Sequence, residues 1–291
     1  MSEPVAAASA DDRRLAMQAV LVTVGVYAAF GLLRLVSIDL AGFVLVACFY
    51  FLPGWLYRAH EERAREDEVG PESPIPPFVP RGWKTAAWAV ALIFPPFILL
   101  TLWFYSGVCR GDTGVVEPLL WIEAKTPWAG SLEGFWAGQC RHYGDSFFPS
   151  QFVLPAAWAG WAKDASELGI PYALGAFGGA LLDAAIGLFA VALPEEVFHR
   201  GYLMGALDRQ FVPKRRILGV ALGWGAVISS LLFALGHLIA LAQPVRLATF
   251  IPAMVFAWLW RRSGSLWAPA LFHFASNLLM QVLLASLFAG T

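Results

Sequence analysis

Seven long apolar stretches constrain the fold of this chain more than any other feature of its sequence. A helix needs about 20 apolar residues to cross the roughly 30 Å of hydrocarbon in a bilayer. Six of the stretches contain no Asp, Glu, Lys or Arg, and the seventh contains only Asp183. The stretches cover residues 15–33, 40–57, 85–108, 172–193, 217–242, 247–260 and 266–290. They predict an all-α, polytopic bundle of about seven transmembrane helices.

Composition excludes most other classes of protein. Hydrophobic residues make up 58% of the chain and charged residues 14%, against about 45–50% and 25% in soluble domains. A soluble enzyme and a disordered chain are therefore excluded. The formal net charge of −1 gives no reason to expect a nucleic-acid partner. The lipid bilayer is the expected surrounding of this chain.

The basic residues predict the orientation of the bundle. Arg13 and Arg14 precede the first stretch, and other basic residues lie in the linker 58–84 and in the turns 214–216 and 261–262. All of them fall on one side if the N-terminus is cytoplasmic, as the positive-inside rule requires. The first stretch is too long for a signal peptide. We therefore expect an integral membrane protein with a cytoplasmic N-terminus. We also expect the membrane to be the inner membrane of a bacterium, which the charges do not determine.

Three regions follow from this arrangement. Residues 1–84 hold two spans and a Pro-rich cytoplasmic linker, 85–171 hold the third span and a polar outer loop, and 172–291 hold a four-helix membrane core. The apolar segment 151–161 is a candidate for an eighth span. Cys109 and Cys140 of the outer loop form either a disulfide or two free thiols.

Polar clusters in the last four stretches predict a functional site, because ionisable groups inside a membrane are costly. A rise of 1.5 Å per helical residue places the three clusters at the same depth in the membrane, provided that the fourth helix continues past Arg200. Side chains four residues apart on a helix lie on one face. The polar residues are Glu195, Glu196, His199 and Arg200 in the first cluster, His237 in the second, and His273 and Asn277 in the third.

These residue types suit hydrolysis of a peptide bond. Glu196 is expected to pair with Arg200 one turn later, which leaves Glu195 as a free carboxylate. A carboxylate held in a poorly solvated cavity can act as a general base on water. His237 and His273 can hydrogen-bond that water or the substrate carbonyl. Asn277 supplies an amide donor for a developing oxyanion. Asp183 lies too far along its helix to share this chemistry.

The three motifs resemble those of a known family. Glu195-Glu196-x-x-x-Arg200, Phe233-x-x-x-His237 and His273-x-x-x-Asn277, in this order, are similar to the motifs of the CPBP intramembrane endopeptidases. That family includes the Rce1-type CAAX prenyl proteases and bacteriocin-processing relatives. The resemblance covers about residues 172–290.

The resemblance implies a role for each motif residue. Glu195 would activate the attacking water with the help of His237, and His273 and Asn277 would form the oxyanion hole. Glu196 and Arg200 would support the site, and no cofactor or metal is implied. His199 stands where many relatives carry an aromatic residue, and its role stays open. The substrate would be a membrane-associated protein or peptide.

Other functions compete with this interpretation. Glu195, His237 and His273 could instead bind Zn²⁺, since two histidines and a carboxylate form a known catalytic ligand set. A non-catalytic membrane scaffold or immunity factor with the same fold is a second alternative. A transporter is a third, although the sequence contains no internal repeat of the kind that many transporters carry.

Overall fold

A computed structural model describes residues 9–66, 82–104, 181–241 and 244–288, and these are mostly helical. The chain divides into two compact units. The first unit contains residues 1–87 and 186–274, and the second contains residues 88–185 and 275–291. Among the described residues, the second unit holds most of α3 (Trp83–Phe104) and the second half of α12 (Trp267–Phe288). The polar motif residues up to His273 all belong to the first unit.

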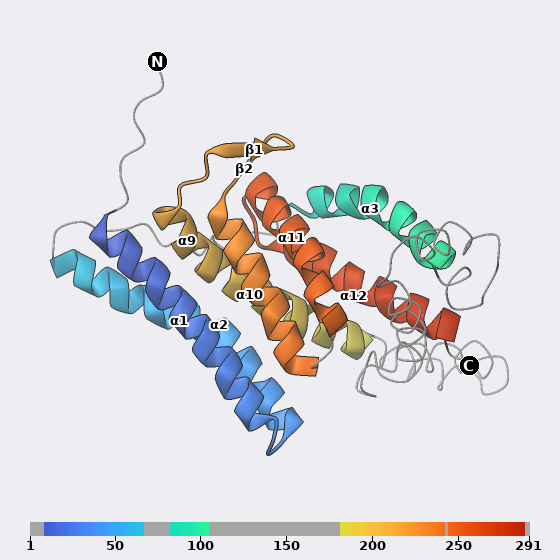
Figure 1. Cartoon of the computed structure of the whole chain (residues 1–291), viewed down its shortest axis with the longest axis horizontal. Coiled ribbons are helices and arrows are strands. Elements are labelled where there is room, and N and C mark those ends of the chain that lie inside the picture. Colours follow the sequence, from blue (N-terminus) through green and yellow to red (C-terminus); the bar gives the residue numbers. More distant parts are fainter. Residues whose placement is uncertain (1–8, 67–81, 105–180, 242–243, 289–291) are drawn as a thin grey trace, which may run out of the picture. The chain divides into compact units, whose positions relative to one another are not determined.

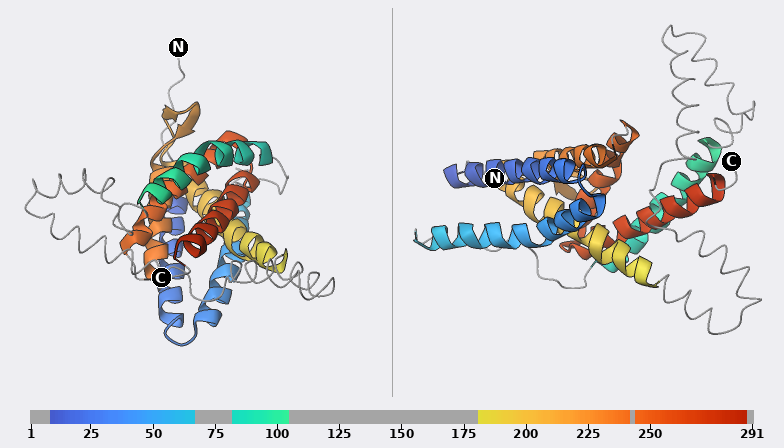
Figure 2. Two further views of the ribbon diagram at one scale, coloured as in Figure 1. Left: turned by 90° about the vertical axis from the view of Figure 1, so that its right-hand side faces the viewer. Right: turned by 90° about the horizontal axis from the view of Figure 1, so that it is seen from below.

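Two long helices begin the first unit. α1 (Ala10–Leu33) starts at a capping box, in which the Ser9 side chain accepts a hydrogen bond from the backbone of Asp12 and the Asp12 carboxylate accepts one from the backbone of Ser9. A short turn leads into α2 (Ile38–Glu66). α1 packs against α2 and also against α9 and α10 of the later part of the chain (Figures 1 and 2). The N-terminal helices thus contact the region that carries the polar motifs.

The helix that carries both glutamates alternates between π-helical and α-helical hydrogen bonding. It runs through the π-helical segment η2 (Gly187–Ala192), the short α8 (Leu193–Glu196), a second π-helical segment η3 (Val197–Met204) and α9 (Gly205–Gln210). Pro194 has no backbone N–H and crowds the preceding turn. π-Helical turns accommodate such an interruption and are frequent at functional sites. The prediction that this helix continues past Arg200 is confirmed.

A small β-hairpin corrects the prediction that residues 217–242 are helical throughout. β1 (Arg215–Ile217) pairs antiparallel with β2 (Val220–Leu222), and α10 (Trp224–Leu241) begins only after them. Leu218 and Gly219 between the strands both have positive φ, 48° and 80°. Two such residues in a row make the tight turn that joins hairpin strands. Apolar residues expected in a span therefore form strands, and the bundle is not purely α-helical.

The last helices follow the hairpin. The 3₁₀ segment η4 (Pro244–Thr249) leads into α11 (Phe250–Ser263), which packs against α10. Gly264 ends α11 with a φ of 64°, a left-handed conformation that glycine adopts without strain, and its N–H donates to the carbonyl of Trp260. α12 starts three residues later and carries His273 in its second turn.

Three of the described helices are long and apolar enough to cross a membrane. They are Ala10–Leu33, Ile38–Tyr57 and Trp83–Trp103, and the shorter helix Trp224–Ala240 is also apolar. Large side chains such as Phe43, Phe51 and Trp88 are exposed on these helices, where lipid rather than water is the favourable surrounding. The chain is therefore an integral membrane protein. Residues 105–180, which include Cys109, Cys140 and the segment 151–161, lie outside the described residues.

Candidate active site

Glu196 and Arg200 form the buried ion pair that their spacing predicts. Both side chains are completely buried, and Arg200 Nε lies 3.1 Å from Glu196 Oε2. Arg200 Nη2 donates a 2.9 Å hydrogen bond to the carbonyl of Ala253 on α11. Each charge compensates the other in a region where an unpaired ion would be strongly unfavourable. The pair therefore ties the glutamate helix to α11.

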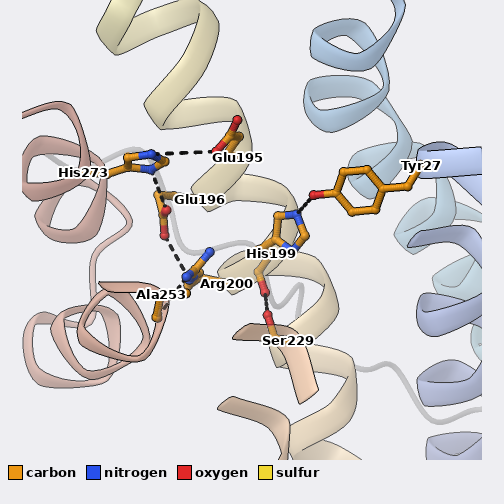
Figure 3. Close-up of polar contacts among 8 residues, drawn as sticks. All are labelled: Tyr27, Glu195, Glu196, His199, Arg200, Ser229, Ala253 and His273. Carbon is orange, nitrogen blue, oxygen red and sulfur yellow. Dashed lines mark hydrogen bonds and ion pairs between the residues drawn. The ribbon is translucent and has the colours of Figure 1, made fainter. Parts of the chain in front are cut away.

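His273 lies between the two adjacent glutamates, as Figure 3 shows. Its Nδ1 is 3.0 Å from Glu196 Oε1, and its Nε2 is 3.8 Å from Glu195 Oε2. The carboxylate of Glu196, which is paired with Arg200, can only accept hydrogen bonds. Nδ1 of His273 therefore carries a proton and donates a hydrogen bond to Glu196. Nε2 is then the ring atom that faces Glu195. We call Glu195, Glu196, Arg200 and His273 the charged cluster.

Glu195 is the carboxylate of the charged cluster that lacks a close partner, whereas Glu196 Oε2 lies 3.1 Å from Arg200 Nε. The side chain is only 17% exposed, and its Oε2 is buried without a hydrogen-bond partner among the described residues. Buried polar atoms nearly always have a partner, so an orphaned carboxylate oxygen indicates a place for water or a ligand. Oε2 and His273 Nε2 are close enough to hold one water molecule, displaced from the line that joins them.

Aromatic rings pack against Arg200 and His273 of the charged cluster. The guanidinium carbon of Arg200 lies 4.8 Å from the ring centre of Phe233 and 5.1 Å from that of Phe256. The ring of Phe256 also stacks on His273, with centroids 4.6 Å apart and planes 19° apart. Such cation–π contacts hold the guanidinium in place. Phe256 belongs to none of the three motifs, and only its place on α11 brings it here.

His237 reaches the charged cluster through the aromatic residue of its own motif. Its Nδ1 donates a 3.0 Å hydrogen bond to the carbonyl of Phe233, one turn earlier on α10. The rings of His237 and Phe233 are 4.4 Å apart, and Phe233 also contacts the ring of His273 at 5.9 Å. In the neutral ring this arrangement leaves Nε2 of His237 as an acceptor. Within the described residues, no hydrogen bond or ion pair joins His237 to the glutamates.

His199, whose role the sequence leaves open, is buried beside the charged cluster, and its ring contacts that of Phe233 at 5.0 Å. Its Nε2 is 2.8 Å from the hydroxyl of Tyr27 on α1, and its backbone carbonyl accepts a 2.7 Å hydrogen bond from Ser229 (Figure 3). The rings of Tyr27 and Phe49 contact the imidazole at 5.9 and 5.6 Å. We call His199, Tyr27, Phe49 and Ser229 the His199 pocket.

Tyr27 is the residue of this region that sequence reasoning missed. It lies in the first apolar stretch, and aromatic residues are so common in membrane proteins that a tyrosine there does not indicate a particular role. Its ring packs so closely on the backbone of Gly236 that a Cβ at that position would overlap it. Gly236 directly precedes His237. No signal in the sequence links these two positions, which are separated by about two hundred residues.

Comparison with known proteins agrees with the motifs. Residues 177–279 match the family model of the type II CAAX prenyl endopeptidases, Rce1-like. This stretch is Rce1-like. It contains Glu195, His237, His273 and Asn277, so the family resemblance inferred from the motifs is confirmed. Among curated proteins and among solved structures, nothing matches the chain. Tyr27 lies outside the Rce1-like region.

Two polar residues of the Rce1-like region or its border belong to the second unit. Asn277 follows His273 by one turn on α12 and is partly buried. Asp183 is partly buried on the helix that leads into η2, twelve residues before Glu195. The expectation that Asp183 takes no part in the chemistry of Glu195 stays a prediction.

A catalytic zinc site would require Glu195, His237 and His273 to converge. Across residues 9–66, 82–104, 181–241 and 244–288, no three His, Cys, Asp or Glu side chains are arranged as metal ligands. His273 Nδ1 is bonded to Glu196 instead. Within the described residues, these side chains do not form the ligand set that the zinc alternative needs.

Proposed function

We propose that this chain is a glutamic-type intramembrane endopeptidase, which hydrolyses a peptide bond of a membrane-associated protein or peptide. The orphaned carboxylate oxygen of Glu195, held beside His273 in a buried charged cluster, is the observation that carries the proposal. The Rce1-like region supports a protease activity of the CAAX-protease type. The proposal adds that Glu195 is the general base of this reaction.

Glu195 acts as the general base. A water molecule hydrogen-bonded to Glu195 Oε2 attacks the scissile carbonyl carbon while the carboxylate takes one of its protons. The carbonyl double bond opens to an oxyanion. The proton on Glu195 then passes to the leaving amine as the C–N bond breaks, so a carboxylic acid and an amine are released. Glu195 returns to its starting state.

His273 and Asn277 stabilise the oxyanion. His273 Nδ1 is committed to Glu196, so only Nε2 can donate to the substrate, and the ring must carry a proton on both nitrogens to do so. With that proton the charged cluster contains two positive and two negative groups. Asn277 adds its amide N–H from the next turn of α12.

The remaining motif residues orient these groups. Glu196 fixes the ring of His273, and Arg200 fixes Glu196, so both are positioning residues. His237 assists the attacking water through Nε2, because its Nδ1 is held by the carbonyl of Phe233. An ion pair anchored on both sides by aromatic rings keeps the geometry rigid, which catalysis by preorganised charges requires.

The proposal includes the arrangement in the membrane. Seven spans, with the segment 151–161 as a candidate eighth, would place the N-terminus in the cytoplasm of a bacterium and the polar loop on the outer side of its inner membrane. The regions 1–84, 85–171 and 172–291 would divide the chain, and the last would hold the catalytic helices. Three apolar helices and the distribution of basic residues support this arrangement.

A paired proteome comparison tests the activity and identifies the substrate in the same experiment. Cells that carry the wild-type chain are compared with cells that carry Glu195→Gln, which keeps the size of the side chain but removes the base. Asp183→Asn is the matched control, since it neutralises another carboxylate on the same helix. We expect an uncut membrane-associated protein or peptide to accumulate only with Glu195→Gln. Identical cleavage products in all three strains would contradict the proposed function.

A further inference from the structure

A basic depression lies between the β-hairpin and the end of α11, away from the charged cluster. It encloses about 340 Å³ and is lined by Arg216, Arg261 and Arg262 together with the hairpin residues Gly219, Val220 and Ala221. Arg216 and Ala221 are directly opposite each other in the hairpin, so their side chains share one face. The small side chain of Ala221 leaves the space open. Figure 1 shows the hairpin beside α10 and α11.

Positive charge in the depression is not balanced. Arg261 forms an ion pair with Asp208, whose carboxylate is almost fully buried. Neither Arg216 nor Arg262 has an ion-pair partner within the described part of the chain, and both residues are exposed. Two free guanidinium groups facing a shared hollow are suited to a phosphate, which arginine binds through paired N–H donors.

The tip of the hairpin is apolar where a water-facing turn would be polar. Leu218 is 81% exposed and Ile217 49% exposed. The φ of 48° at Leu218 is one that Asn, Asp or Gly normally provides in such turns. Ile217 is paired with Val220 in the hairpin, and Val220 and Leu222 are buried against the helices. The exposed apolar pair thus extends beyond the core, next to the arginines.

We propose that this hairpin and its depression form a binding site for the headgroup of an anionic phospholipid. The arginines would bind the headgroup phosphate, and Ile217 and Leu218 would insert beside the acyl chains. Apolar side chains flanked by Lys and Arg are the usual composition of segments that lie in a membrane interface. Basic clusters at the cytoplasmic border attract anionic lipids, and the basic turns of this chain are expected on that side.

An anionic phospholipid accounts for both the arginines and the apolar tip of the hairpin, whereas a soluble anion accounts for the arginines alone. Free phosphate would use the arginines and leave the apolar tip in water. The acidic segment 61–68 of the same chain would neutralise the arginines and likewise leave the tip exposed. The bilayer offers phosphate next to hydrocarbon, and the hairpin carries Arg216 two residues before Leu218. The proposal does not depend on the hydrolytic activity.

Lipid retention measures the site directly. The full chain is placed in nanodiscs of phosphatidylcholine alone or with phosphatidylglycerol, and the lipids that stay bound after extraction are counted by native mass spectrometry. The test variant is Arg216→Gln with Arg262→Gln. The control is Arg13→Gln with Arg14→Gln, which removes the same charge from exposed positions expected on the same side. Melting temperatures in phosphatidylcholine show that all forms are folded.

We expect the wild type and the control to retain phosphatidylglycerol in preference to phosphatidylcholine. The test variant should bind phosphatidylglycerol about tenfold more weakly or worse, since it removes both unpaired guanidinium groups that would bind the headgroup phosphate. Leu218→Asn, which suits the turn but removes the apolar tip, should weaken retention by a smaller factor. Arg216→Lys with Arg262→Lys should retain part of the binding, which keeps the test valid if the Gln variant does not fold.

Three results would overturn the proposal. An equal loss in the Arg13/Arg14 control would mean that net charge alone attracts the lipid. Stabilisation of the wild type by inorganic phosphate in phosphatidylcholine nanodiscs, equal to that by phosphatidylglycerol, would identify a site for a soluble anion. Unchanged retention in the folded Gln variant would show that the depression does not bind lipid.

Discussion

The charged cluster and the His199 pocket meet on one helix, where His199 directly precedes Arg200, yet their side chains differ in chemistry. In the charged cluster an imidazole lies between two carboxylates, and one carboxylate oxygen has no partner among the described residues. In the His199 pocket the imidazole is enclosed by aromatic rings, its Nε2 contacts one neutral hydroxyl, and its Nδ1 has no hydrogen-bond partner among the described residues. Buried charge with a vacant acceptor suits chemistry, whereas neutral, closely packed groups suit stability.

The two regions also differ in where their residues come from. All four members of the charged cluster belong to the Rce1-like region, while Tyr27 and Phe49 of the His199 pocket come from the N-terminal helices outside it. The comparison therefore separates a chemical centre from the packing that this chain builds around it. Variants in either region test whether the separation holds.

The largest effect is expected from Glu196→Ala. It leaves Arg200 completely buried without its partner, a change that costs about 3–5 kcal/mol. It also frees Nδ1 of His273, so cleavage per folded molecule should fall as well. Thermal melting and a cleavage assay on the accumulated substrate measure the two losses. If Glu196→Ala melted like the wild type, the pair would not have the structural role assigned to it.

Asn277→Ala should slow cleavage strongly while sparing stability. One oxyanion donor contributes about 2.7–4 kcal/mol, or about 10²–10³ in kcat. Asn277→Asp should be worse, because it places a carboxylate where negative charge develops. The measurement is kcat per folded molecule, together with KM, which should change little. An alanine variant with more than about a third of the wild-type kcat would end the oxyanion assignment.

Gly236→Ala should destabilise the protein through the His199 pocket. The added methyl group overlaps the ring of Tyr27, and overpacking of this kind costs about 1–3 kcal/mol. Tyr27→Ala in the same chain should remove the clash, so the two losses should not add. A double-mutant cycle of melting measurements checks this. Additive losses would show that the ring and the glycine backbone are not in contact.

Tyr27→Phe is expected to have the smallest effect. It also tests most directly whether the His199 pocket has a different role from the charged cluster. It removes one hydroxyl and leaves Nε2 of His199 buried without a partner, at a cost near the lower end of about 1–3 kcal/mol. Cleavage per folded molecule should change by less than about threefold. A large loss of cleavage with an unchanged melting temperature would place the His199 pocket in the chemistry and remove the distinction drawn above.

Local spacing made part of this molecule predictable from its sequence. The i,i+4 rule gave the pairing of Glu196 with Arg200, and the length of the apolar stretches gave helices that are long enough for a membrane. The β-hairpin was missed because Ile217, Val220 and Leu222 are as apolar as a span, and only Gly219 signals a turn. The bond from His273 to Glu196 joins residues 77 positions apart. Such contacts depend on how helices pack, which spacing along one helix does not determine.

The cleavage rate of Glu195→Gln per folded molecule tests the central claim most directly. The substrate is the membrane protein or peptide that accumulates in the variant strain, the wild type and Asp183→Asn are measured beside it, and melting confirms equal folding. A general base contributes about 10²–10⁴ to the rate, so Glu195→Gln should lose at least about a hundredfold while Asp183→Asn stays near the wild type. Cleavage by Glu195→Gln within about tenfold of the wild type would contradict the claim that Glu195 activates the attacking water.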